Sequence, residues 1–199
     1  MATTVVKRTR LSPQARRAQL IDLGVQMLST RTLDGLSVEE IAESAGISRG
    51  LLFHYFDTKA DYRVEVVREV ARQMLAVTAP DPEREPLDAL QTSVAAFVDY
   101  VSENRDAYVS LLRGGASEPA LQAVLDETRT EMARRTLDGA DALGIPSTVR
   151  GRLAVRGWIA FTEEVVITWL TDPDAELDRD ELLVLLTTGL PAMVRGVID

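Results

Sequence analysis

The stretch "SVEEIAESAGISRGLLFHYFDTKADY", residues 37 to 62, decides the fold of the N-terminal part of this chain. Ser37 is followed three residues later by Glu40, a capping-box spacing that starts a helix. Gly46 then permits a tight turn, because glycine readily takes a positive φ. Ser48 is placed to cap a second short helix. Two short helices joined by a turn that contains a glycine predict a helix-turn-helix.

The second helix is expected to end near Phe56, and the apolar residues of both helices fall on their inner faces. In such a motif the N-terminal residues of the second helix enter the major groove of DNA. The residues left on the outer face therefore predict the DNA contacts, which are Ser37, Ser48, Arg49, Gly50, Leu51, His54, Tyr55 and Lys59.

The chemistry of these side chains suits DNA. Arg49 can donate to guanine edges or to phosphate, and Leu51 can meet a thymine methyl group. Lys59 begins the next helix and can reach backbone phosphates. Alternatives remain for the aromatic cluster: His54 can instead stack in it structurally, and Tyr55 can belong to the core or to the contact surface. Phe53 and Phe56 are expected in the core.

The rest of the chain also has helical periodicity. Ser12 followed by Pro13 marks the start of a first helix, and a longer helix is expected from Lys59 to about Thr78. The prolines of "PDPEREP", residues 80 to 86, end that helix. Helical patterns resume at 86–113, 118–143, 147–171 and 178–198. The fold class predicted is therefore all-α, with about nine helices.

The charge is distributed unevenly. The chain has a net charge of -9, yet residues 1–62 hold eight Lys and Arg against seven Asp and Glu. Such asymmetry indicates a polyanionic partner for the less acidic end, although a solvated basic tail explains it equally well. The acidic remainder does not prevent DNA binding, because charges are screened over about 10 Å.

Composition argues against several other functions. The 199 residues contain no cysteine and one histidine, His54, which removes thiolate metal sites, thiol catalysis and His-rich sites. The acidic segment 172–181 lacks the glycine of a calcium-binding loop and is better explained by a helix cap near Asp178. We expect no catalytic residues, no metal and no cofactor. With no signal peptide or membrane-length apolar run, we expect a soluble cytoplasmic protein.

The residues quoted above resemble the signature of the TetR family of one-component transcriptional regulators. The resemblance spans about residues 13–73 and includes "AGIS" at 45–48, "FHYF" at 53–56 and Lys59. It implies a helix-turn-helix domain at 13–73, a ligand-binding and dimerisation domain at 74–199, and a homodimer that reads a palindromic operator. One departure is the small pair of the first helix, which here is Leu23-Gly24 and suggests altered packing there.

The C-terminal part carries two strongly apolar helical segments, at 155–170 and 181–198, the second interrupted by Pro191. Two such helices from each chain can form an intermolecular four-helix bundle, or they can pack within one chain. A ligand pocket of mostly apolar character is expected among the middle helices. Its candidate residues are Phe97, Tyr100, Tyr108, Met132, Trp158, Phe161 and Thr162.

The function predicted is a repressor that a small, largely apolar ligand releases from double-stranded operator DNA. Two alternatives within DNA binding are an activator and a ligand-free regulator controlled by a protein partner. An alternative from another class is a helical enzyme with a degenerate DNA-binding module.

Overall fold

A computed structural model describes residues 11–114, 118–146 and 148–198. All regular structure in these residues is helical, which confirms the all-α prediction. The basic residues Lys7, Arg8 and Arg10 lie outside the described residues. The elements are α1 (Pro13–Leu28), the 3-10 helix η1 (Leu33–Gly35), α2 (Val38–Ser44), α3 (Arg49–Leu52), α4 (Lys59–Val77), α5 (Pro86–Glu103), α6 (Arg105–Gly114), α7 (Pro119–Asp138), α8 (Val149–Thr171) and α9 (Arg179–Ile198).

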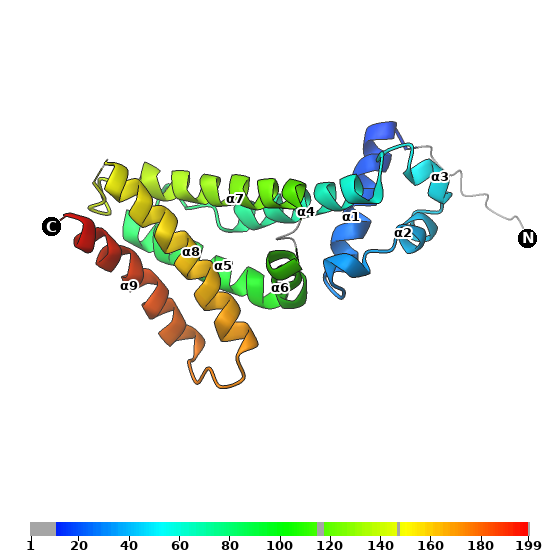
Figure 1. The fold of residues 1–199 in the computed structure, drawn as a ribbon. Helices are drawn as coiled ribbons and strands as arrows, with labels where there is room; N and C mark the ends of the chain where they lie inside the picture. The colour runs from blue at the N-terminus through cyan, green and yellow to red at the C-terminus, as the bar shows by residue number, and fades with distance from the viewer. Residues whose placement is uncertain (1–10, 115–117, 147, 199) are drawn as a thin grey trace, which may run out of the picture.

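The molecule is elongated, with α1, α2 and α3 at one end and α8 and α9 at the other (Figure 1). The long helix α4 leaves the first group and runs beside α7, so that one continuous element belongs to both ends. This arrangement follows from the sequence, because no proline or glycine interrupts residues 59–77 and "PDPEREP" then stops the helix.

The N-terminal end has its own apolar core. Leu20, Ile41 and Leu52 are completely buried there, and Tyr62 from α4 joins them. The Tyr62 hydroxyl donates to the carbonyl of Leu20 at 2.8 Å, which ties α4 to α1. Gly24 lies at this crossing, and a Cβ atom there would collide with the Tyr62 hydroxyl. The glycine thus permits the close approach of α1 and α4.

A second core joins α5, α8 and α9. Val98, Val155, Leu182 and Leu186 are completely buried in it, and the Trp158 indole donates to the carbonyl of Leu186 at 2.8 Å. Pro191 lies inside α9 without ending it. The helix cap predicted near Asp178 is present, since the Asp178 and Glu181 carboxylates accept from each other's backbone N–H groups at 2.9 and 3.0 Å.

Three boundaries differ from the prediction. The helix expected over 118–143 ends earlier, since α7 stops at Asp138 and residues 139–144 form turns. The pattern over 86–113 forms two helices, because the chain turns at Asn104, whose side-chain amide donates to the carbonyl of Tyr100 at 2.8 Å. The second helix of the helix-turn-helix ends at Leu52 rather than near Phe56, and residues 53–55 continue as a tighter turn. Here Tyr55 donates to Leu52 across three residues, at 2.9 Å.

Candidate nucleic-acid interface and ligand cavity

The helix-turn-helix has the geometry predicted for it. Gly46 has a φ of 64°, the conformation that the turn between α2 and α3 requires. Leu52 and Phe56 are buried on one side of α3 and its following turn, while Arg49 and Leu51 are exposed on the other. Leu51 has 41% of its surface exposed, so a large apolar side chain faces solvent from α3.

Serine and threonine caps fix where the helices begin. The Ser37 hydroxyl accepts from the N–H of Glu40 at 3.3 Å, and the Ser48 hydroxyl accepts from the N–H of Leu51 at 3.2 Å. The Glu40 carboxylate does not return to Ser37 as a capping box would have it, but pairs with Arg31 at 2.7 Å. Each cap leaves the serine O–H available as a donor at a helix N-terminus, where phosphate is favoured.

Arg49 is held by two neighbours that sequence reasoning did not foresee. Its guanidinium lies 2.9 Å from the carboxylate of Glu39 on α2 and 5.5 Å from the ring centroid of Phe53. Both charged side chains are more than half exposed, so the ion pair is weak and can open. The half-buried Phe53 ring offers the Arg49 guanidinium a cation–π contact at the surface of α3.

The remaining predicted contacts surround α3. His54 is exposed rather than stacked in the core, and its ring meets that of Tyr55 edge-on at 5.6 Å. Tyr55 is half-buried, between the two alternatives considered for it. Lys59 is exposed at the first position of α4. The fold therefore gathers the predicted residues at the start of α2, along α3 and its turn, and at the start of α4.

A cavity of about 430 Å³ opens among α5, α7 and α8 at the other end of α4. Thr78, which follows α4, forms part of its wall, and residues of the 80–86 loop also line it. Its apolar lining consists mainly of Leu90, Val94, Phe97, Met132, Leu143, Trp158 and Ile159.

Four of the predicted pocket residues line this cavity, namely Phe97, Met132, Trp158 and Thr162. The other three lie elsewhere, since each is engaged by a neighbouring helix. The Tyr100 hydroxyl donates to the carbonyl of Val70 on α4 at 3.2 Å. Tyr108 is buried beside Glu163, and Phe161 packs near Gly189 of α9.

Several lining residues were missed. Leu90 and Val94 share one face of α5 with the predicted Phe97 at helical spacing, a signal that could have identified them. The 80–86 loop was interpreted only as a helix breaker, although several of its residues line the cavity.

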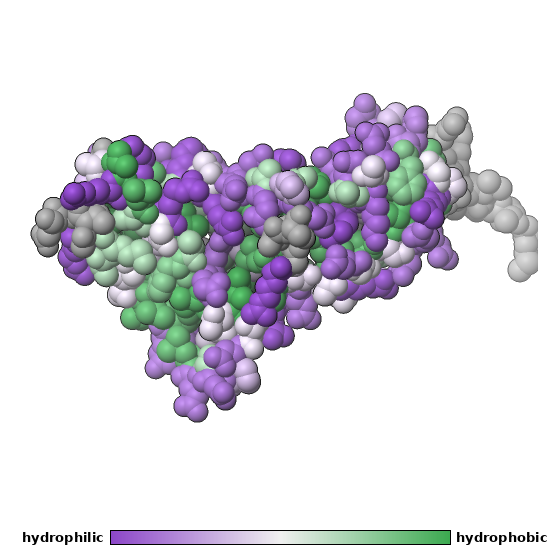
Figure 2. Space-filling model, viewed as in Figure 1, coloured by the Kyte–Doolittle hydropathy of each residue, from purple (hydrophilic) through white to green (hydrophobic). Residues whose placement is uncertain are grey.

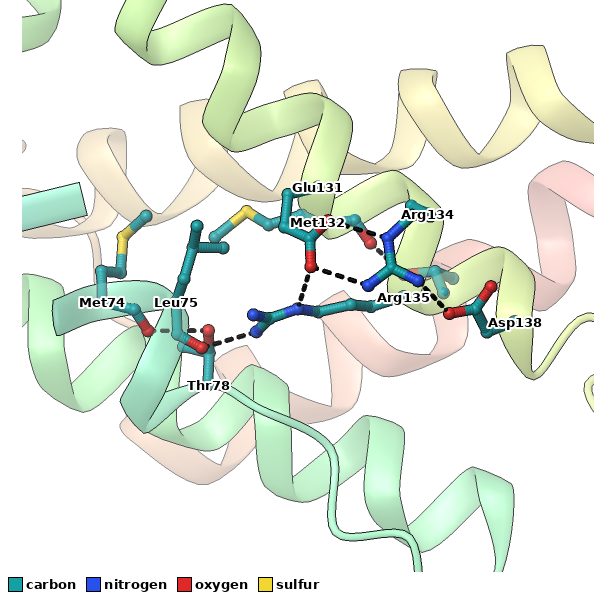
Figure 3. A network of polar contacts seen from close by, with 9 residues as sticks. Met74, Leu75, Thr78, Glu131, Met132, Arg134, Arg135 and Asp138 are labelled. Atoms are coloured by element: carbon teal, nitrogen blue, oxygen red, sulfur yellow. Dashed lines mark hydrogen bonds and ion pairs between the residues drawn. The ribbon is translucent and has the colours of Figure 1, made fainter. Parts of the chain in front are cut away.

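A polar network joins the cavity to α4 (Figure 3). The Arg135 guanidinium, from α7, donates to the carbonyl of Leu75 near the end of α4 and to the Glu131 carboxylate at 2.9 Å. Glu131 also accepts from Arg134, and these two arginines lower the pKa of Glu131 to about 2. Arg135 itself lines the cavity, so one side chain contacts both the cavity and α4.

Glu163 is the buried charge of the cavity wall. Its carboxylate accepts from the Arg129 guanidinium at 2.8 Å, and the Tyr108 hydroxyl lies 3.5 Å away. Burial raises the pKa of Glu163, and Arg129 opposes that rise. Burial likewise raises the pKa of Tyr108. These groups form a structural ion pair beside the cavity.

No group of three or more His, Cys, Asp or Glu side chains is placed to hold a metal ion within residues 11–114, 118–146 and 148–198. No helix in this part of the chain is long and apolar enough to cross a membrane.

These features define a helix-turn-helix DNA-binding protein with a separate helical domain that holds a cavity. The family model "Bacterial regulatory proteins, tetR family" matches residues 20–66, and "Tetracyclin repressor-like, C-terminal domain" matches residues 86–193. The chain belongs to the TetR family and is a DNA-binding transcriptional regulator, a class of proteins that are not enzymes.

Curated relatives are similar over different lengths. The regulator BetI of Vibrio campbellii is 30% identical over 87 residues, which cover 44% of this chain and 44% of that protein. The chain thus spans about half the length of the first BetI relatives it matches. The transcriptional activator FasR of Mycolicibacterium smegmatis is 24% identical over 182 residues, which cover 86% of this chain and 79% of FasR.

Solved structures share the fold over nearly the whole chain. A tetR-family regulator from Streptomyces coelicolor has a TM-score of 0.75 and 25% identity, with 94% of this chain and 90% of that chain covered. FadR from Bacillus subtilis, solved in complex with stearoyl-CoA, has a TM-score of 0.62 and 20% identity, with 90% of this chain and 98% of that chain covered.

Proposed function

We propose that this regulator is a homodimeric repressor that a small, largely apolar ligand releases from a palindromic operator. The observation that carries the proposal is the course of α4. This helix begins at Lys59, immediately after the helix-turn-helix, and ends at Val77, next to the cavity wall. A ligand that favours one position of α4 would also favour one position of α3, and the coupling is reciprocal.

Specific contacts support α4 as the coupling element. At one end, Tyr62 bonds to Leu20 of α1, so α4 and the DNA-reading module move together. At the other end, Arg135 bonds to the carbonyl of Leu75 and lines the cavity. A displacement of α4 in each protomer would change the separation of the two α3 helices, and dimeric readers depend on that spacing.

Exposed apolar side chains on α8 and α9 support a homodimer (Figure 2). Leu153 and Val184 each have 62% of their surface exposed, and Val149 has 61%. The two helices pack against each other, so these exposed residues lie on one helix pair, whose outer apolar surface is uncovered. Two copies of this pair would complete a four-helix bundle and cover it.

The two apolar cores support a division of the chain into two functional regions. We assign residues 13–73 to DNA binding and residues 74–199 to ligand binding and dimerisation. Within α4, Val66 and Val67 pack in the N-terminal core, whereas Met74 packs in the C-terminal core. We further assign the operator contacts to Ser37, Ser48, Arg49, Gly50, Leu51, His54, Tyr55 and Lys59, and the effector contacts to Phe97, Met132, Trp158 and Thr162.

The test is binding to the upstream region of the protein's own gene at several salt concentrations, with random DNA as competitor. A protected palindrome with a steep salt dependence would support an operator-binding dimer. Loss of that protection when a cavity ligand is added would support release by a ligand. Equal affinity for random DNA, or protection unchanged by a ligand that fills the cavity, would contradict the proposal.

An activator is the second candidate function. It is favoured by the similarity to FasR, a transcriptional activator, over 86% of this chain. A reporter gene placed behind the protected site decides between the two, because deletion of the regulator raises expression for a repressor and lowers it for an activator.

A further inference from the structure

Four hydroxyl side chains line the cavity, and they differ in whether they are hydrogen-bonded. Thr78 and Thr136 each donate to the carbonyl four residues earlier, at 2.8 and 3.1 Å. The hydroxyl oxygens of Ser93 and Thr162 are buried and have no hydrogen-bond partner among the described residues. A buried polar group without a partner costs about 1–3 kcal/mol, so two in one cavity require an explanation.

The two unpartnered hydroxyls come from different helices and border the same space. Ser93 lies on α5 and Thr162 on α8, and Thr162 has only 7% of its surface exposed. Around them the wall is apolar, with Phe97 and Trp158 close in sequence to each. A molecule filling the cavity therefore meets hydrocarbon on most sides and hydrogen-bonding groups at these two points.

The charged groups of the cavity are already paired. Each of the five charged residues in its lining has an ion-pair partner within the described residues. The pairs are Asp81 with Arg84, Arg135 with Glu131, Asp138 with Arg134, and Glu163 with Arg129, at 3.3, 2.9, 2.6 and 2.8 Å. The Glu163 and Arg135 pairs are partly buried, so an ionic ligand beside them would have to displace a partner or remain unpaired in an apolar site, and both are costly. The Asp81 and Asp138 pairs are about half exposed and cost less to open.

We propose that the effector is an uncharged molecule whose apolar body carries a hydroxyl or carbonyl oxygen that hydrogen-bonds to Ser93 and Thr162. This rests on the proposed function, since it assumes that the cavity is the effector site. It also separates this chain from the similar FadR structure, whose ligand stearoyl-CoA is an anion.

The experiment uses the full-length protein without DNA and three probes that share one ring system: naphthalene, 1-naphthol and 1-naphthoate. Their affinities are measured at pH 7 by displacement of the fluorescent apolar probe N-phenyl-1-naphthylamine. We expect 1-naphthol to bind about three- to tenfold more tightly than naphthalene, as one net hydrogen bond provides. We expect 1-naphthoate to bind more weakly than both.

Isosteric variants identify the hydroxyls responsible. In Thr162→Val, and in Ser93→Ala on the other helix, the preference for 1-naphthol over naphthalene should fall to less than twofold in at least one variant. The affinity for naphthalene should not fall, because neither variant introduces a polar group into the cavity. The matched control is Thr136→Val, which removes a cavity hydroxyl that already has a partner and should retain the full preference.

The inference is overturned if 1-naphthoate binds as tightly as 1-naphthol, if naphthalene and 1-naphthol bind equally, or if both variants keep the preference. If the fluorescent probe does not bind, the part of the inference that gives the effector an apolar body is overturned. These outcomes concern only whether a ligand binds in the cavity. A ligand that binds as expected but leaves operator affinity unchanged would instead contradict the proposed release from DNA.

Discussion

The guanidinium of Arg49 at the start of α3 lies 2.9 Å from the carboxylate of Glu39 on α2. The residue that we propose as a base contact is therefore paired within the protein in the absence of DNA. Because the pair is exposed, it costs little to open, and a base or phosphate that replaced Glu39 would offer a comparable charge-assisted contact.

Arg49→Ala should weaken operator binding by about 1–3 kcal/mol and relax specificity at one base position, if Arg49 reads a base edge. Affinity is measured by fluorescence anisotropy on the operator and on single-base variants. Glu39→Gln is the matched control, since it removes the competing carboxylate and should leave affinity unchanged or up to about fivefold tighter. Equal losses in both variants would mean that the α2 surface, not Arg49, makes the contact.

Lys59 is expected to contact a phosphate, because it is exposed at the first position of α4, beside α3. Lys59→Gln should weaken binding to all DNA sequences alike and reduce the slope of log affinity against log salt by about one unit. The control is Arg72→Gln, farther along α4 and paired with Glu69, which should leave the slope unchanged. A loss of affinity confined to the operator would show that Lys59 contacts a base instead of a phosphate.

The sequence predicted the N-terminal module well because its signals are local. Ser12, Ser37 and Ser48 each cap the helix that follows them, and a cap depends only on residues a few positions away. The break between α5 and α6 at Asn104 was not predicted, because no proline or glycine marks it in the sequence. The early end of α3 was not predicted either, since the backbone changes to a tighter turn after Leu52.

The cavity was predicted less well, for a physical reason. Periodicity identifies the apolar face of a helix but not which neighbour that face meets. Tyr100 and Phe97 are both aromatic residues on α5, yet one bonds to Val70 of α4 and the other lines the cavity. Whether the hydroxyl groups of Ser93 and Thr162 have hydrogen-bond partners likewise depends on long-range packing.

The exposed surface on α8 and α9 predicts the effect of a charge placed there. Val184→Glu should convert a dimer to monomers, because a carboxylate in the centre of an apolar interface remains without a partner. Sedimentation velocity measures the oligomeric state. The control is Leu87→Glu, an exposed apolar position on α5 that should leave the dimer intact. A monomeric starting protein would contradict the proposed interface.

The crossing of α1 and α4 predicts a coupled pair of stability changes. Gly24→Ala should destabilise the protein by about 1–3 kcal/mol through overpacking against Tyr62 and Val66. Tyr62→Phe should cost about 1 kcal/mol through loss of its hydrogen bond to Leu20. The double variant should lose less than the sum, since the colliding hydroxyl is gone. Additive losses in urea unfolding would show that Val66 alone limits the space.

The buried pair of Arg129 and Glu163 predicts a pH-dependent stability. Arg129→Met removes the group that lowers the pKa of Glu163 and leaves burial to raise it further above its ordinary value of 4.5. A carboxyl whose folded pKa is raised favours the folded state when protonated. Its contribution is therefore fully present below pH 4.5 and is lost as the pH rises through the folded pKa.

We accordingly expect Arg129→Met to lose about 1.5–3 kcal/mol near pH 8, the value of a hydrogen bond to a charged group, and much less near pH 5. Urea unfolding at a series of pH values measures the difference from the unmodified protein. The control is Arg129→Met combined with Glu163→Gln, which cannot titrate at this position and should differ from the unmodified protein far less steeply with pH. If Arg129→Met alone loses the same free energy of unfolding at pH 5 and at pH 8, Glu163 is solvated once Arg129 is removed. The pair would then contribute packing rather than charge.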